Sequence, residues 1–116
     1  MTLAVLKSLS TVNGDDFFYP DDIENCEIEL VAEIGPENDG SNYFNVIVVT
    51  AKFLGSKSPI WLAQKKGHLV LDVFDWVSVE NSINKLLSHQ PKGSWDEVAS
   101  FLSEYLNWEF DGYQKA

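Results

Sequence analysis

The sequence predicts an α+β fold: a mostly antiparallel four-stranded sheet, two C-terminal helices packed on one face, and a short helix before the last strand. Runs with the two-residue period of strands dominate the first part of the chain, and runs with the 3.6-residue period of helices follow. Strands that cluster early and helices that cluster late are typical of α+β rather than alternating α/β proteins. For a chain of 116 residues we expect one domain over residues 1–116.

The first strand is expected over residues 3–9, a short apolar run at the edge of the sheet. The loop that follows sets three aromatic residues, Phe17, Phe18 and Tyr19, among four aspartates. Two interpretations stay open for this loop. Either Phe17 or Phe18 packs on the core beneath it, or one of them stays exposed as an anchor for a partner, ringed by charge.

The stretch from Cys26 to Thr50 predicts the hairpin around which the sheet is built. Apolar and charged residues alternate from 27 to 34, so one face of this strand is apolar and the other carries three glutamates. Gly, Pro, Asn and Asp residues between 35 and 40 supply a turn. The return run, residues 43–50, is apolar on both faces, as a central strand is. The helices should cover the apolar face, which is formed by Ile28, Leu30, Ala32 and Ile34.

Residues 51–54 are expected to lead out of this strand, and residues 55–57 to form a break. Ser58 and Pro59 then have the order of an N-cap and a first helical residue, and Gly67 suits a left-handed C-cap. A two-turn helix is therefore expected between Ser58 and Gly67. Residues 68–75 predict the last strand, with alternating apolar side chains.

Two helices are expected at the C-terminal end. Asp75 or Ser78 caps the first, which should run to about residue 89. Its apolar stripe consists of Val79, Ile83, Leu86 and Leu87. Ser94 and Glu97 have the spacing of a capping box and predict the start of the second. Its apolar face is expected to consist of Trp95, Val98, Ala99, Leu102, Tyr105 and Leu106, and residues 107–113 should form an aromatic tail.

The charge of the chain is strongly uneven. The net charge is −10, and residues 1–40 hold ten of the 18 acids and one lysine, while the whole chain lacks arginine. Such a surface repels nucleic acid and attracts basic partners. The plain alternative is that the acidity only keeps the protein soluble.

The sequence gives no indication of a membrane or secreted protein. The longest apolar runs are far shorter than a membrane span, and the N-terminus does not have the pattern of a secretory signal. Cys26 is the only cysteine, so no internal disulfide can form. These features predict a cytoplasmic protein.

The sequence also contains no recognisable catalytic constellation. Cys26, His68 and His89 lack a surrounding motif, and two isolated histidines do not make a zinc site. No calcium loop or phosphate loop is present. A glycosidase-type pair of carboxylates stays open among 18 acids. We expect no enzymatic activity, no cofactor and no metal.

Several short segments together resemble a known family. They are Pro20-Asp21-Asp22 after aromatics, Ile34-Gly35-Pro36, residues 43–54, Phe74-Asp75-Trp76, Trp95-Asp96-Glu97-Val98, and Trp108-Glu109-Phe110-Asp111 with Tyr113. In order and spacing they resemble the immunity protein 8 family of bacterial polymorphic toxin and contact-dependent growth inhibition systems. Ala51 and Phe53 depart from the proline and tryptophan of the family pattern, and residues 55–66 differ.

The resemblance implies a protein that binds and neutralises the C-terminal domain of a cognate toxin. Many such toxins are nucleases, so the expected partner is a basic nuclease, an RNase in particular. Separately, we expect the protein to be a monomer rather than a homo-oligomer. An adaptor or immunity protein for a non-nuclease partner, or a small hydrolase, is the alternative. The acidic loop and strand face are the expected toxin-binding surface: Asp15, Asp16, Phe18, Tyr19, Asp21, Asp22, Glu24, Glu27, Glu29, Glu33, Glu37 and Asp39.

Overall fold

The predicted hairpin lies at the centre of the sheet. A computed structural model describes residues 3–13, 19–57 and 67–108. In chain order the elements are β1 (Ala4–Thr11), β2 (Glu27–Pro36), β3 (Asn42–Thr50), α1 (Ala51–Lys57), β4 (His68–Leu71), α2 (Trp76–Leu87), α3 (Trp95–Leu102) and β5 (Asn107–Trp108). The sheet order is β1-β2-β3-β4, and the two-residue β5 also pairs with β3.

Most strand pairs are antiparallel, as predicted. β1 pairs with β2 and β2 with β3 in this way, whereas β3 and β4 run parallel. A parallel pair needs a connection that returns to the same end of the sheet, and α1 begins that connection. The α+β class is confirmed. The parallel pair was not foreseen.

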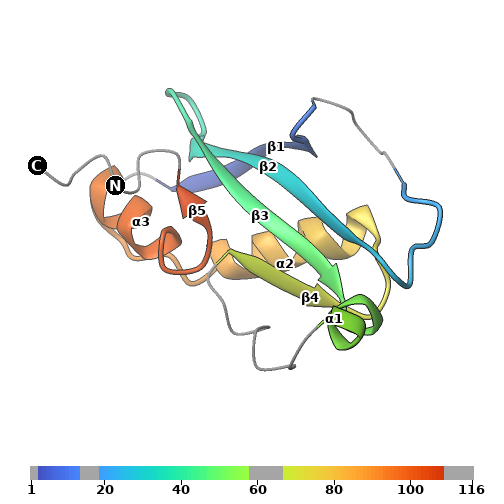
Figure 1. Cartoon of the computed structure of the whole chain (residues 1–116). Coiled ribbons are helices and arrows are strands. Elements are labelled where there is room, and N and C mark those ends of the chain that lie inside the picture. Colours follow the sequence, from blue (N-terminus) through green and yellow to red (C-terminus); the bar gives the residue numbers. More distant parts are fainter. Residues whose placement is uncertain (1–2, 14–18, 58–66, 109–116) are drawn as a thin grey trace, which may run out of the picture.

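The helices cover the apolar face of the hairpin, also as predicted. Leu30, Ala32 and Ile34 are completely buried. They form one core cluster with the buried side chains of α2 and α3. In Figure 1, α2 passes behind the sheet and α3 lies beside β5. Asp75 caps α2, and Ser94 with Glu97 forms the expected capping box at α3. None of the described helices is long and apolar enough to cross a membrane.

The first helix begins earlier than expected. Residues 51–57 form α1, where the sequence predicted an exit from the strand and a break. The reason is Thr50, whose buried side chain accepts a hydrogen bond from the Phe53 amide and so starts a helix directly at the end of β3. The expected helix after Ser58 lies outside the described residues. Gly67 has the left-handed conformation predicted for it, with φ of 82°.

Three predictions for the C-terminal part are wrong in extent. β4 ends at Leu71 because the chain leaves the sheet to bury Phe74, whose amide donates to the Ile23 carbonyl oxygen at 2.7 Å. α3 ends at Leu102, so Tyr105 does not belong to its apolar face and is 50% exposed. The predicted tail begins as a strand, since Asn107 pairs with Asn45 of β3.

Candidate functional site

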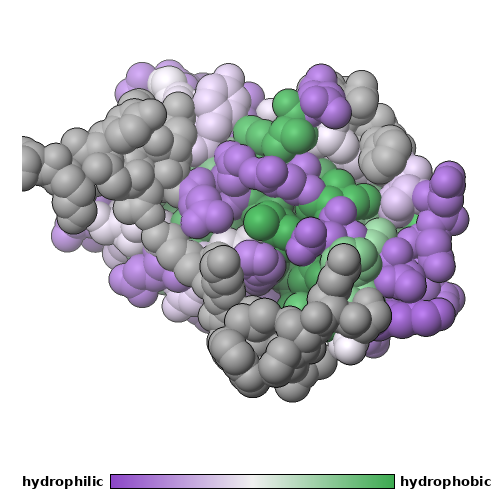
Figure 2. Space-filling view, viewed as in Figure 1, coloured by the Kyte–Doolittle hydropathy of each residue, from purple (hydrophilic) through white to green (hydrophobic). Residues whose placement is uncertain are grey.

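The face of the sheet opposite α2 carries the acidic residues of β2, and we call it the open face. Glu27, Glu29, Val31 and Glu33 alternate with the buried residues of β2 and therefore share this face. Directly across from them on β3 lie Val49, Ile47, Asn45 and Tyr43, in that order. Figure 2 views this face and shows hydrophobic side chains near its middle with hydrophilic ones around them.

Neighbouring polar side chains hold two of the three glutamates in place. Glu29 Oε2 accepts a hydrogen bond from Asn45 Nδ2 at 2.7 Å. Glu33 accepts from Ser41 Oγ at 2.6 Å and from Ser8 Oγ at 3.0 Å. The hydrogen bond from Ser41, followed by that from Ser8 and the charge of Lys7, lowers the pKa of Glu33 below its ordinary value. Glu33 is therefore a fixed, negatively charged group. A general acid needs the opposite shift.

The described part of the acidic loop, residues 19–26, directly precedes β2 and lies beside its first residue, Glu27. Tyr19 is 48% exposed, and its ring stands edge-on to Phe74 with centroids 5.7 Å apart. Its hydroxyl donates to Asp75 Oδ1 at 3.3 Å. Asp22 Oδ1 accepts from the Glu24 amide at 3.0 Å, which turns the loop toward the strand. Asp21, Asp22 and Glu24 are exposed. Asp15, Asp16 and Phe18 lie outside the described residues, as does Phe17.

Glu37 and Asp39 lie at the other end of β2, in the turn of the hairpin. Both are exposed. Lys7 Nζ donates to the backbone oxygen of Asp39 at 2.6 Å, which places a positive charge beside this turn. β2 has ten residues, so the acids of the loop and of the turn are separated by about 30 Å, at about 3.3 Å per residue. The predicted site residues thus form a band along β2 and do not form one cluster.

Sequence reasoning missed the residues of β3 that complete the open face. Tyr43 is 47% exposed, and Asn45 and Ile47 are half-buried beside the glutamates. The strand was interpreted as central and apolar on both faces, which hid the fact that only one face is covered by α2 and α3. A loop of residues 35–41 would have given the register, because it makes Ile34 and Asn42 the last pair and places Tyr43 opposite Glu33.

The residues considered for catalysis lie in different parts of the fold. Cys26 is buried, and burial, with a smaller effect of Asp22, raises the pKa of its thiol. His68 is half-buried on β4, and His89 is exposed after α2. Among residues 3–13, 19–57 and 67–108, no group of three or more His, Cys, Asp or Glu side chains is placed to hold a metal ion.

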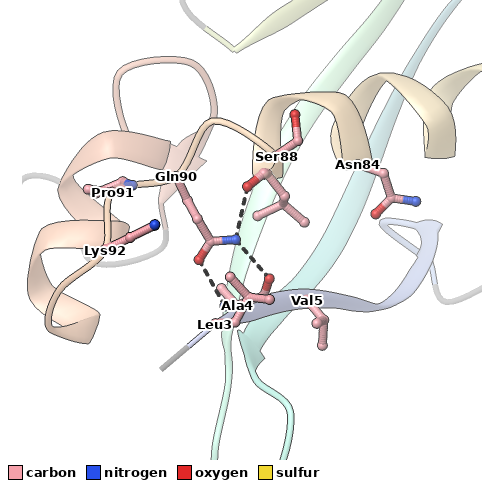
Figure 3. A pocket seen from close by; sticks show the side chains of 9 residues that line it. Leu3, Ala4, Val5, Asn84, Ser88, Gln90, Pro91 and Lys92 are labelled. Atoms are coloured by element: carbon pink, nitrogen blue, oxygen red, sulfur yellow. Dashed lines mark hydrogen bonds between the residues drawn. The ribbon is translucent and has the colours of Figure 1, made fainter. Parts of the chain in front are cut away.

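A cavity of about 440 Å³ lies between β1 and the end of α2, but its lining does not suit acid–base chemistry. Its described lining residues include Lys92 and no carboxylate, imidazole or thiol. Figure 3 shows the Gln90 side chain, which follows α2, reaching to Ala4, and its amide makes three hydrogen bonds, two to Ala4 and one to Leu87. The cavity therefore gives no support to the hydrolase alternative.

Comparison with known proteins adds one finding. The family model described as Immunity protein 8 matches residues 4–113, nearly the whole chain. No curated protein and no solved structure matches the chain.

Proposed function

Because the chain belongs to the immunity protein 8 family, we propose that it binds and neutralises the nuclease domain of a cognate toxin and so protects the cell that makes both. Membership of this family makes it an immunity protein of a polymorphic toxin system. The nuclease activity of the toxin, its basic surface and its delivery by contact-dependent growth inhibition are the proposed part. We also propose that the protein acts in the cytoplasm as a monomer without a cofactor, and that it inhibits the toxin by binding alone.

The observation that carries the proposal is the acidic band along β2. Exposed carboxylates follow one another from Asp21 through Glu27 and Glu29 to Asp39. A nuclease binds a polyanion and therefore presents a basic surface. An acidic band of this length can face such a surface, speed the encounter and exclude the nucleic acid from it.

The first test is co-expression with the toxin domain encoded immediately upstream of the gene. We expect growth to be rescued and the two proteins to co-purify. Purified toxin domain should degrade RNA, and added immunity protein should stop the reaction. If neither rescue nor co-purification occurs, the proposal fails. If both occur with a toxin that does not cleave nucleic acid, the nuclease part is wrong and the alternative of a non-nuclease partner takes its place.

The second test measures the role of charge. Replacing Glu27 and Glu29 by lysine should lower the association rate constant by about tenfold or more at low salt, and should weaken its dependence on salt. The matched control replaces Glu80 on α2 and Glu104 in the turn after α3, both exposed, by lysine, with the same change in net charge. Equal effects of the two double variants would mean that total charge matters and the open face does not.

A further inference from the structure

We propose that an apolar seam on the open face, centred on Tyr43, anchors the toxin, while the surrounding carboxylates mainly guide it there. The seam consists of Val31, Tyr43 and Ile47. This inference rests on the proposed function, and it names the part of the open face that holds the partner once the partner has arrived.

The register of the hairpin brings the three seam residues together. Val31 lies directly opposite Asn45, and Tyr43 and Ile47 are the residues two positions before and after Asn45 on β3. Tyr43 and Ile47 are thus both diagonal neighbours of Val31, at about 7–8 Å between backbones, within reach of large side chains. The seam therefore crosses from β3 to β2 and back on one face.

Tyr43 has the properties of an interface anchor. Its side chain is 47% exposed although it lies on the interior strand β3, while Val31 and Ile47 beside it are half-buried. A tyrosine on a paired strand loses little conformational freedom on binding, because only two side-chain torsions need to be fixed. Tyrosine is also one of the residue types that most often dominate binding energy.

The rim of the seam is charged and already ordered. Glu33 lies directly opposite Tyr43, and Glu29 directly opposite Ile47. Hydrogen bonds from Ser41 and Asn45, at 2.6 and 2.7 Å, fix these two carboxylates before any partner binds. An apolar centre with a polar rim is the usual anatomy of a protein interface.

The charge of this rim selects the occupant. A second copy of the chain would bring Glu29 and Glu33 of one molecule against the like-charged rim of the other, which is unfavourable. A nucleic acid would be repelled by the same groups. The surface fits a protein with basic side chains around an apolar centre, and we assign it to the toxin domain.

The test compares two tyrosines of nearly equal exposure on different faces. Tyr43→Thr removes the ring and keeps a good strand residue, and Tyr105→Thr is its control, because Tyr105 is 50% exposed and follows α3. Binding of the purified upstream-encoded toxin domain is measured by biolayer interferometry. For Tyr43→Thr we expect the dissociation constant to rise by about 30-fold or more, mostly through faster dissociation. For Tyr105→Thr we expect less than about threefold.

Tyr43→Phe serves as the second variant, because it keeps the ring and should bind within about fivefold of the wild type. Thermal unfolding of each variant establishes that it is folded. Should Tyr43→Thr fail to fold, Tyr43→Lys, which puts a positive charge at the centre of the seam, should weaken binding by at least the same factor. If the wild type binds and dissociation is unchanged in Tyr43→Thr, or in Tyr43→Lys where that variant takes its place, the seam is overturned and the proposed function stands. Absence of wild-type binding overturns both.

Discussion

The hydroxyl group of Thr50 accepts a hydrogen bond from the backbone amide of Cys26, with the two atoms 3.0 Å apart. In return the Thr50 amide donates to the Cys26 carbonyl oxygen, also at 3.0 Å. The pair closes the open end of the hairpin just beyond the last paired residues, Glu27 and Val49. The same hydroxyl accepts from the Phe53 amide at 3.4 Å. One buried side chain therefore holds the start of β2, the end of β3 and the start of α1.

Thr50→Val should destabilise the protein by about 1–3 kcal/mol, because it keeps the shape of the side chain and leaves the buried Cys26 amide without its acceptor. Thr50→Ser keeps the hydroxyl and loses one methyl group, and should cost about 1 kcal/mol. Urea unfolding measures both, and hydrogen exchange of the Cys26 amide should quicken only in the valine variant. A valine variant as stable as the wild type would contradict this role of the hydroxyl.

Cys26 should be unreactive in the folded protein. Burial raises the pKa of its thiol, Asp22 adds to the effect, and the thiol donates to the Ile23 carbonyl oxygen at 3.9 Å. The folded state therefore keeps this proton to higher pH than the unfolded state. Its contribution to stability is constant below the thiol pKa of the unfolded chain, about 8.5, and is lost as pH rises above it.

Iodoacetamide labelling at pH 8 checks this directly. Labelling should be at least about tenfold slower in buffer than in urea, because the reactive species is the thiolate. Asp22→Asn should speed the reaction of the folded protein slightly. Equal labelling rates in buffer and in urea would mean that the thiol is accessible.

The predictable parts of this fold are those with a local cause. Alternation along residues 27–34 correctly predicted which side chains of β2 face the core, and the spacing of Ser94 and Glu97 predicted the start of α3. Gly67 was expected to take a left-handed conformation, and it does. In each case the determining contact lies within a few residues of the chain.

The parts that were missed depend on contacts between distant segments. The Gly67 amide donates to the Tyr105 carbonyl oxygen, and its own carbonyl oxygen accepts from Ile47. These bonds determine where β4 begins beside β3, and they cannot be predicted from the local sequence because they join distant segments. The site was affected in the same way. The acids could be read from the sequence, but the neighbours of Tyr43 could be named only once the register of β2 and β3 was known.

Glu33 should titrate below the ordinary range, with Ser41 as the larger cause. Because the pKa of Glu33 is lowered in the folded state, its contribution to stability is present above the pKa of glutamate in the unfolded chain, about 4.3, and is lost as pH falls through the lower folded pKa. Ser41→Ala should move this pKa upward, and Ser8→Ala should move it upward by less. Titration of the Glu33 carboxyl carbon by NMR gives both values. A larger shift in Ser8→Ala, or none in either variant, would contradict this order of causes.

The Gln90 side chain makes hydrogen bonds to the outer edge of β1, where the described part of the sheet has no further strand. Its Oε1 accepts from the Ala4 amide at 2.9 Å, and its Nε2 donates to the carbonyl oxygens of Ala4 and Leu87 at 3.0 and 2.9 Å. These bonds satisfy backbone groups that an edge strand would otherwise leave open.

Gln90→Ala should therefore destabilise the protein by about 1–3 kcal/mol and speed hydrogen exchange at Ala4. Gln90→Glu at neutral pH should do the same, since a carboxylate cannot donate to the two carbonyl groups. His89→Ala, at an exposed neighbouring position, should change neither quantity, and unaltered exchange at Ala4 in Gln90→Ala would show that β1 is held at this end by β2 alone.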